Sequence, residues 1–187
     1  MKPKKTQLFF IALLPPVEVQ EVANGIKEQF AQFYQSSAAQ KSPPHITLQP
    51  PFRWKVIELP LLQENLQKFA MSQSAVPIIL DGFGAFKSRV IYINVLQTPE
   101  LMSLQTELIT MLKLSLNIQD KLAKNNPFSP HITVAFRDLT KENFQRAWPE
   151  FQWQQLHFEF TVPQLTLLNH NGKFWEVIQE FNFQVIG

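Results

Sequence analysis

The spacing of hydrophobic residues changes along the chain between runs typical of buried strands and stripes typical of amphipathic helices. Residues 8–14 form an unbroken apolar run of strand length, which stops at Pro15 and Pro16. Apolar residues then recur every three or four positions, which predicts a helix with one buried stripe. The stripe consists of Val19, Val22, Ile26, Phe30 and Phe33. The chain therefore begins as a strand followed by an amphipathic helix.

The rest of the chain repeats a similar series of elements. The pattern predicts strands within residues 41–52, 77–83, 90–96, 132–136 and 156–162, helices over 60–70, 101–116 and 140–148, and a closing hairpin of 165–168 with 174–183. Asn171-Gly172 signals the turn of this hairpin. The order gives two β-α-β-α-β units, approximately residues 6–86 and 87–187, the second with an extra closing strand. We predict one α+β domain over residues 1–187 with two similar lobes.

The first apolar run has a second interpretation, because Lys2, Lys4 and Lys5 precede it as basic residues precede the apolar core of a signal peptide. No small-residue cleavage site follows closely, and no apolar stretch approaches the ~20 residues that span a bilayer. The strand interpretation is favoured, and we expect no membrane association. The chain contains no cysteine, which excludes disulfides, thiolate nucleophiles and zinc–thiolate sites. A cytoplasmic protein is the default expectation.

The charge of the chain limits the ligands that it can hold. Charged residues make up 17%, and 17 Lys and Arg against 15 Asp and Glu give a formal charge of +2. This excess is too small for a broad basic patch that would coat duplex nucleic acid. An anionic ligand must therefore be held by a few local groups.

A repeated tetrapeptide is the strongest functional signal. Pro-His-Ile-Thr occurs at residues 44–47 and again at residues 130–133, and an aliphatic residue follows each copy. Each copy opens a predicted strand, after a long helix and before a shorter one. Side chains two positions apart share one face of a strand, so each histidine shares a face with the threonine of its own copy.

Two lobes that face one another would bring all four polar side chains into one cleft, with the helices over the opposite sheet faces. Imidazole titrates near neutral pH, so one of His45 and His131 can take a proton from a hydroxyl or water while the other protonates the leaving oxygen. The hydroxyls of Thr47 and Thr133 can donate hydrogen bonds to non-bridging phosphate oxygens. These side chains predict phosphoester chemistry without a metal or another cofactor. Which histidine is the acid and which is the base stays open.

Two His-x-Thr-hydrophobic motifs in a duplicated α+β chain resemble the 2H phosphoesterases, and in particular their 2′-5′ RNA ligase-like branch. The resemblance covers nearly the whole chain, including the opening strand, residues 80–86 and residues 173–177. It implies two pseudo-symmetric lobes whose antiparallel sheets face an open central groove, with the helices outside. It also implies hydrolysis, or reversible ligation, at RNA ends, nucleotide 2′,3′-cyclic phosphates or 2′-5′ linkages. The site residues that it carries over are His45, Thr47, His131 and Thr133.

Residues just after each motif are candidates for substrate binding. Phe52 and Arg53 follow the first motif, and Phe136 and Arg137 follow the second. Each arginine could contact a phosphate, and each phenylalanine could stack on a base. The competing interpretation places the arginines on the solvated surface and the phenylalanines in the core. The same alternatives apply to Lys87, Arg89 and Trp175.

Other kinds of site lack their usual signatures. His157 and His170 lie outside the motifs, one on the polar side of a predicted strand and one beside a turn, and both are interpreted as structural. The sequence has no His-Glu-x-x-His, and neither motif contains a carboxylate, which argues against a metal site. It also has no Gly-x-Ser-x-Gly elbow and no P-loop. Residues 82–84, Gly-Phe-Gly, are too short for a dinucleotide fingerprint and are interpreted as a turn.

Two alternatives to an enzyme that acts on RNA remain open. The same groove could bind a nucleotide or an RNA end without turnover, with both His-Thr pairs as ligand contacts. The substrate could also be a small cyclic phosphate unrelated to RNA. The two intact pairs favour an enzyme, which we expect to act as a monomer without an obligate protein partner.

Overall fold

The computed structural model describes residues 5–119 and 127–184 and has an α+β fold. The elements follow in the order β1 (Thr6–Leu13), α1 (Val17–Tyr34), η1 (Ala38–Lys41), β2 (Ile46–Lys55), η2 (Val56–Glu58), α2 (Leu59–Ala70), β3 (Val76–Phe86), β4 (Val90–Val95), α3 (Pro99–Leu116), β5 (His131–Ala135), α4 (Lys141–Phe151), β6 (His157–Val162), β7 (Gln164–His170) and β8 (Trp175–Asn182). The labels η1 and η2 mark short 3₁₀ helices. The order of strands and α-helices agrees with two predicted β-α-β-α-β units, followed by the closing hairpin of β7 and β8.

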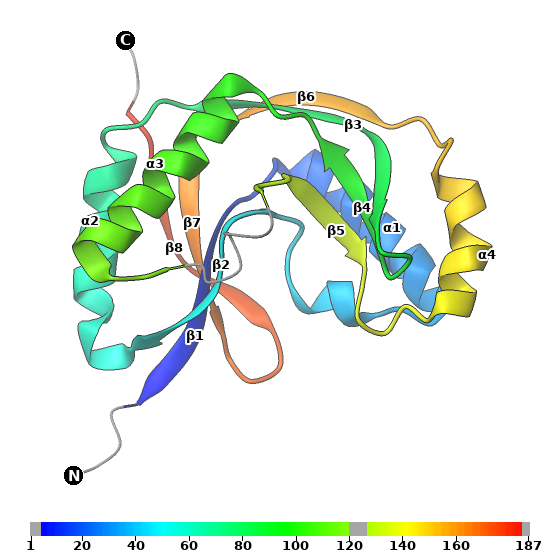
Figure 1. The fold of residues 1–187 in the computed structure, drawn as a ribbon, viewed down its shortest axis with the longest axis horizontal. Helices are drawn as coiled ribbons and strands as arrows, with labels where there is room; N and C mark the ends of the chain where they lie inside the picture. The colour runs from blue at the N-terminus through cyan, green and yellow to red at the C-terminus, as the bar shows by residue number, and fades with distance from the viewer. Residues whose placement is uncertain (1–4, 120–126, 185–187) are drawn as a thin grey trace.

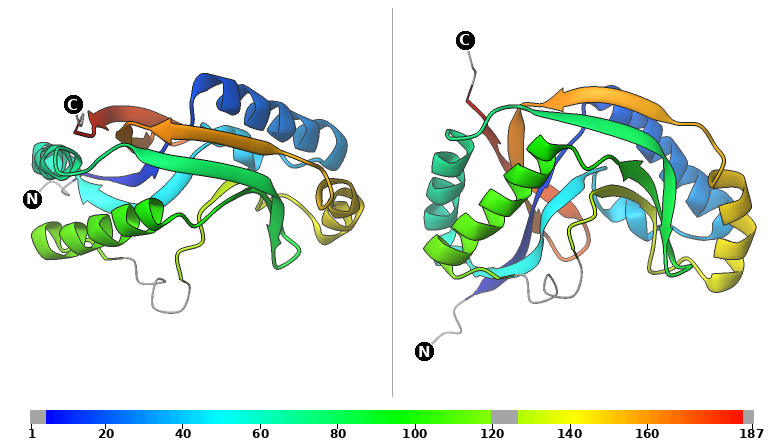
Figure 2. Two further views of the ribbon diagram at one scale, coloured as in Figure 1. Left: turned by 90° about the horizontal axis from the view of Figure 1, so that it is seen from above. Right: turned by 45° about the horizontal axis from the view of Figure 1, so that its top comes forward.

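The strands form two antiparallel four-stranded sheets, β2-β1-β7-β8 and β5-β4-β3-β6. Helix α2 packs against β8 and α3 packs against β2, whereas α1 packs against β5 and α4. Figure 1 and Figure 2 show the pair α2 and α3 at one end of the molecule and the pair α1 and α4 at the other. The predicted α+β class with two antiparallel sheets is confirmed.

Each sheet combines elements from both sequence units. Strand β3 of the first unit pairs with β4 and β6, and β7 of the second unit pairs with β1. The helices are exchanged in the same way, because α1 packs against β5 and α3 packs against β2. The boundary between the units falls in the turn of the β3–β4 hairpin, where Lys87 and Ser88 both have positive φ. A tight hairpin makes its two strands neighbours, so the boundary of the units is not a boundary between the sheets.

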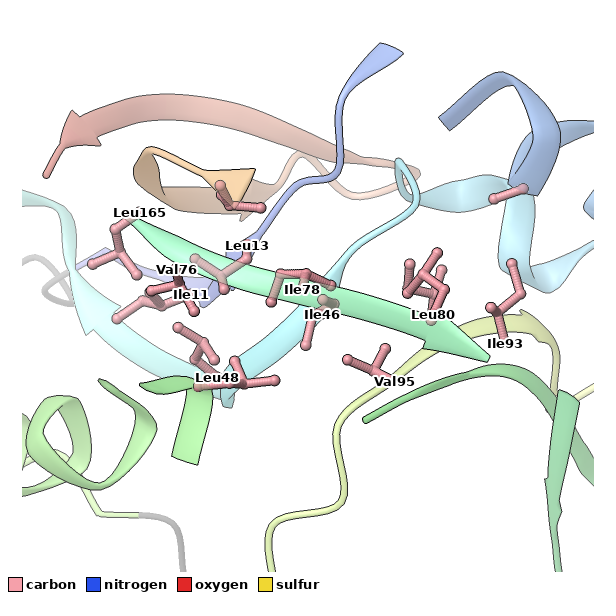
Figure 3. Close-up of a cluster of buried hydrophobic side chains, with 14 of the residues drawn as sticks. Ile11, Leu13, Ile46, Leu48, Val76, Ile78, Leu80, Ile93, Val95 and Leu165 are labelled. Carbon is pink, nitrogen blue, oxygen red and sulfur yellow. The ribbon is translucent and has the colours of Figure 1, made fainter. Parts of the chain in front are cut away.

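One apolar core joins the two sheets. Figure 3 shows Ile11 and Leu48 of the first sheet in one cluster with Ile78 and Ile93 of the second. All four of these residues are at most 1% exposed. Helix α3 adds the leucines that the sequence pattern predicted to face inward, namely Leu101, Leu104, Leu108, Leu112 and Leu116. The sheet faces that the helices cover form this core, and its apolar contacts hold the two sheets together.

Helix α1 buries a different face from the predicted stripe. Val22 is 41% exposed and Phe33 is 63% exposed, so the prediction that both belong to the core is wrong. The buried positions are Val19, Ala23, Ile26, Lys27, Phe30 and Tyr34. They also recur every three or four residues, but the stripe is turned around the helix so that it faces β5 and α4. Contact with these elements, and not the number of apolar residues, sets the buried face.

The segment Gly82-Phe83-Gly84 lies inside β3, so its interpretation as a turn is wrong. Gly82 has a φ of 64°, next to an irregularity in the pairing of β3 with β4. A left-handed residue at such a position forms a bulge, which favours glycine. Gly84 lies opposite Tyr92, and a Cβ atom at Gly84 would overlap the tyrosine ring. One glycine bends the strand and the other leaves room for a ring.

Strand β2 extends beyond the predicted segment even though it contains Pro50 and Pro51. Proline cannot donate a hydrogen bond to a neighbouring strand, which excludes it from the middle of most sheets. β2 is the outermost strand of its sheet and pairs only with β1. An edge strand tolerates proline because one of its sides makes no ladder hydrogen bonds.

The N-terminal apolar run forms β1, an inner strand between β2 and β7. Its residues Phe9 to Leu13 are at most 2% exposed. This confirms the strand interpretation of the run. Among the helices of the described residues, none has the length and apolar character that crossing a bilayer requires.

Replacement of Phe151 by alanine is expected to lower the free energy of unfolding by about 3–5 kcal/mol, the usual cost of removing a buried aromatic side chain. Phe151 stacks on Phe30 at 4.6 Å between ring centroids and meets Phe83 edge-on at 5.3 Å. It thereby joins α4 to α1 and β3. The exposed Phe33→Ala is the control and should change stability by less than about 0.5 kcal/mol. Urea unfolding of both variants checks this, and equal losses would contradict it.

Candidate active site

The two Pro-His-Ile-Thr motifs lie on the edge strands of the two sheets. His45 directly precedes β2, and His131 is the first residue of β5. These are the outermost strands at one end of each sheet, and they pack against each other. The charge of His131 acts on His45, so the two rings lie within electrostatic reach of one another. The fold therefore brings the two motifs together from opposite halves of the sequence.

The motif residues alternate between the core and the opposite sheet face. Ile46 and Ile132 are 0% exposed and belong to the core. The histidine before each isoleucine and the threonine after it are half-buried. Thr47 pairs with Ala12 of β1, and Thr133 pairs with Tyr92 of β4. Each His-Thr pair thus lies on the sheet face that points away from the shared core.

Both imidazoles make the same hydrogen bond to the main chain. His45 Nδ1 lies 2.7 Å from the carbonyl oxygen of Pro43, and His131 Nδ1 lies 2.7 Å from the carbonyl oxygen of Ser129. A carbonyl oxygen only accepts, so Nδ1 of each ring must carry the hydrogen. The neutral rings therefore have an unprotonated Nε2, the atom that can exchange a proton with a substrate. The sequence signals the equivalent position in each motif only weakly, as a proline or serine two residues before the histidine.

Burial gives both rings a low affinity for protons. It is the main reason why the pKa of His45 falls from its ordinary value of 6.5 to about 4, with positive charge on Lys27 and His131 as further causes. Burial also lowers the pKa of His131, and the hydrogen bond to Ser129 opposes this effect. The repulsion between two imidazolium ions in one site makes the doubly protonated state unfavourable. A singly protonated pair is what exchange of one proton between an acid and a base requires.

Aromatic rings line the side chains of both histidines. His45 contacts Phe10 at 4.6 Å between centroids, and Phe10 meets Trp175 edge-on at the same distance. His131 lies 5.0 Å from both Phe86 and Tyr92. These rings cover part of each imidazole and contribute to the burial that lowers both pKa values. Trp175 packs against its neighbours, as its structural interpretation predicted.

The predicted substrate-binding residues lie in four different settings. Phe52 packs against the core, with its ring 6.3 Å from that of Phe9. Arg53 is exposed on β2. Phe136 is half-buried just after β5, and the Arg137 guanidinium lies 5.0 Å above its ring. Core packing accounts for Phe52, while contact of the other three with substrate stays a prediction. Lys87 and Arg89 are exposed in the turn between β3 and β4.

Asp138 joins the segment before the first motif to the segment after the second. Its carboxylate accepts hydrogen bonds from Ser36 Oγ at 2.8 Å and from the backbone N–H groups of Ser37 and Ala38 at 2.9 Å each. These amides begin η1, which leads toward His45. The preceding residue, Arg137, has a φ of 59°. The sequence analysis did not identify Asp138, because its partners are about a hundred residues away in the chain.

The other two histidines lie outside the motifs, and the ring of His170 meets Trp175 edge-on at 4.9 Å between centroids. His157 contacts the carboxylates of Asp81 and Glu159 at 3.7 and 3.1 Å on an exposed surface. An open hollow of about 500 Å³ is lined by Asp81, His157 and the segment that connects α4 to β6, and no residue of the two motifs lines it. His170 Nδ1 accepts from the N–H of Gly172 in the closing hairpin. Within residues 5–119 and 127–184, no three His, Asp or Glu side chains are grouped as a metal site requires.

Sequence comparisons identify relatives over most of the chain. Residues 15–174 match the family model described as the 2′-5′ RNA ligase superfamily. A protein of Geobacillus sp. (strain WCH70), named as a phosphoesterase, is 30% identical over 175 residues, which cover 91% of this chain and 93% of the relative. A similarly named protein of Geobacillus kaustophilus (strain HTA426) is 29% identical over 178 residues, with coverage of 91% and 93%.

Solved structures share the fold over the same length. The crystal structure of the Thermus thermophilus protein TT0787 has a TM-score of 0.71 at 20% identity and covers 96% of this chain and 100% of that one. The structure of E. coli LigT complexed with 3′-AMP has a TM-score of 0.69 at 20% identity, with coverage of 97% and 100%. The two-sheet architecture is therefore common to all three chains.

The low pKa of His45 predicts that the protein loses stability as the pH falls from about 6.5 to 4. Unfolding restores the ordinary pKa of 6.5, so the unfolded chain binds the proton more tightly than the folded chain, whose value is about 4. The contribution present above pH 6.5 is lost toward pH 4 and amounts to about 3 kcal/mol. Urea unfolding of the wild type and His45→Gln at pH 7 and pH 4 measures it. The variant should lose less stability than the wild type, with the exposed His157→Gln as control. Equal pH dependence in all three proteins would contradict the prediction.

Proposed function

Because the chain belongs to the 2′-5′ RNA ligase superfamily, we propose that it is a metal-independent phosphoesterase for 2′,3′-cyclic phosphates of RNA ends or nucleotides, or for 2′-5′ phosphodiester bonds. The matched hydrogen bonds of His45 and His131 carry the proposal, since both leave Nε2 available on a half-buried ring. Two such rings within electrostatic reach form an acid–base pair. The relatives named as phosphoesterases support the same reaction class.

The reaction divides into two proton transfers at one phosphorus atom. One imidazole takes a proton from the attacking water, while the other donates a proton to the oxygen that leaves the ring of the cyclic phosphate. Water adds through its oxygen, one P–O ester bond breaks, and the product is a phosphomonoester. With a 5′-hydroxyl of a second strand in place of water, the same two proton transfers would form a new P–O bond to that strand and break one P–O bond of the cyclic phosphate, which leaves a phosphodiester and is the ligation reaction.

The threonines have a separate task in this proposal. Thr47 and Thr133 lie two residues after their histidines on the same strand faces. Their hydroxyls would donate hydrogen bonds to the two non-bridging oxygens, where negative charge grows in the transition state. Both proton transfers and charge stabilisation then come from protein side chains, so the proposed reaction uses no metal ion.

The proposed class of ligand is a nucleoside phosphate, and crystal complexes of a protein with this fold support it. LigT of E. coli has been crystallised with 3′-AMP and with phosphate. The aromatic rings beside the two histidines offer flat surfaces against which a nucleobase could stack. With few charged residues and a net charge of +2, the chain is suited to a terminal nucleotide more than to a long duplex.

Replacement of either His45 or His131 by alanine is expected to reduce turnover of a nucleoside 2′,3′-cyclic phosphate by ~10²–10⁴, the range for loss of a general acid or base. His157→Ala serves as a matched control, because that histidine is exposed and lies outside the site. The assay uses cyclic phosphates of all four nucleosides and short 2′-5′-linked oligonucleotides, with product analysis by chromatography. A chelator should leave the wild-type rate unchanged.

Several outcomes of this assay would contradict the proposal. Full activity in either motif variant would exclude an acid–base pair. Tight binding of the cyclic phosphates without turnover in the wild type would identify a binding module. Turnover of nucleoside cyclic phosphates without cleavage of the oligonucleotides would exclude the 2′-5′ linkage as a substrate.

Replacement of Thr47 or Thr133 by valine should lower kcat by about 10–10³, the effect of losing one transition-state hydrogen bond. Valine preserves the shape and the β-branching of threonine, so the strands should remain folded. The Michaelis constant should change less than kcat, because the bond strengthens as charge develops on the phosphate. Steady-state kinetics of both variants checks this, with Thr110→Val on the exposed side of α3 as control. An effect confined to the Michaelis constant would assign the hydroxyls to ground-state binding.

A further inference from the structure

A buried lysine lies behind the first motif. Lys27 belongs to the inward face of α1, between Ile26 and Phe30 in the helical stripe, and the residue is 1% exposed. Its Nζ donates a hydrogen bond to the carbonyl oxygen of Ser42 at 2.9 Å. Lysine is rarely buried to this extent, because removing an ammonium group from water is costly. A residue kept there at such a cost needs a role that a leucine would not supply.

Lys27 and His45 hold adjacent carbonyl groups of one short turn. The lysine binds the oxygen of Ser42, and the imidazole Nδ1 binds the oxygen of Pro43. Anchoring the first carbonyl restricts the position of the second, because the proline ring locks φ of Pro43 and leaves ψ as the free rotation between the two groups. Lys27 therefore helps to orient the His45 ring indirectly, through the Ser42 and Pro43 carbonyls and not through a hydrogen bond to the ring itself.

The lysine also distinguishes the electrostatic settings of the two histidines. Burial lowers the pKa of Lys27 to about 8, so the side chain is still largely protonated at neutral pH. Its positive charge from α1 and that of His131 from β5 are the charges that act on His45. The titratable side chain in ring contact with His131 is Tyr92 of β4, whose pKa is raised by burial and which stays neutral. Within residues 5–119 and 127–184, the charges around the two histidines thus differ although the motifs are identical.

On the basis of the proposed function, we propose that Lys27 is a positioning residue that keeps Nε2 of His45 free of its proton, which makes His45 the base and His131 the acid in hydrolysis. Water gives a proton to His45 as its oxygen bonds to phosphorus. The P–O bond to the ribose oxygen breaks, the electron pair stays on that oxygen, and His131 supplies the proton. Solvent then returns the proton from His45 to His131.

This assignment agrees with the relative proton affinities. Burial lowers the pKa of both rings, and positive charge on Lys27 also acts against protonation of His45, which favours His131 as the histidine that carries the proton of a singly protonated pair. That form has the base and the acid ready for reaction. The opposite assignment would need the proton on the histidine with the nearby cation, which is the minor form of the pair.

The test compares Lys27→Met, which removes the charge at similar length, with Lys27→Arg, which keeps it. Lys27→Gln is a second neutral variant that retains a donor for the Ser42 carbonyl. In Lys27→Met and Lys27→Gln, the acidic limb of kcat/KM against pH should move upward by roughly one pH unit, as expected for loss of a nearby charge. The basic limb should stay in place, and Lys27→Arg should preserve both limbs.

An NMR titration of the histidine rings without substrate provides a readout that does not need activity. The wild-type protein should show His45 titrating below His131, and the neutral variants should raise the midpoint of His45 only. The inference is overturned if the titration midpoint of His45 in the wild type is at or above that of His131. It is also overturned if the midpoint of His45 is the same in the wild type and in the neutral Lys27 variants. A basic limb that moves instead would reverse the assignment of acid and base. Absence of turnover with the expected NMR shifts would reject the proposed function and leave the effect of Lys27 on His45 established.

Discussion

The hydrogen bond from each histidine Nδ1 to a main-chain carbonyl is the interaction on which the site geometry depends. It fixes the plane of the ring and places the exchangeable lone pair on Nε2 in both motifs. A carbonyl cannot take over the proton, in contrast to a carboxylate partner. This hydrogen bond raises the proton affinity of each ring, burial lowers it, and positive charge on Lys27 and His131 lowers it further at His45.

Local sequence patterns predicted the histidines and threonines of the site, but not the groups that hold these side chains in position. Alternation along a strand was sufficient to place each histidine and threonine on one face, because neighbouring positions carry buried isoleucines. The carbonyl of Pro43 was not predictable because every residue type has such an acceptor, and the role of Asp138 was not predictable because its partners lie about a hundred residues away in the chain. The burial of Lys27 was not predicted for another reason. The more apolar stripe of α1 included Val22, and only packing against the second sheet shows that the helix is turned.

The same distinction holds for the fold. Each strand and helix follows from local periodicity, so the α+β class and the order of elements were predictable. The partners of the strands are set by contacts between distant segments. The pairing of β1 with β7 and the exchange of α1 and α3 between the sheets depend on which apolar faces meet in the common core. The left-handed conformation of Gly82 and the contact of Gly84 with the Tyr92 ring also depend on the pairing of β3 with β4, so the sequence of β3 alone does not predict them.

The exchange of elements between the sheets constrains how the chain can acquire its structure during synthesis. Strand β1 precedes both of its partners in the chain, and its two edges are filled by β2, the next strand, and by β7, which is synthesised well over a hundred residues later. An apolar strand with an open edge is a template for unwanted association. During synthesis, β1 therefore presents one unpaired apolar edge until β7 has been made, and the sheet that contains β1 can be completed only after the sheet that contains β6.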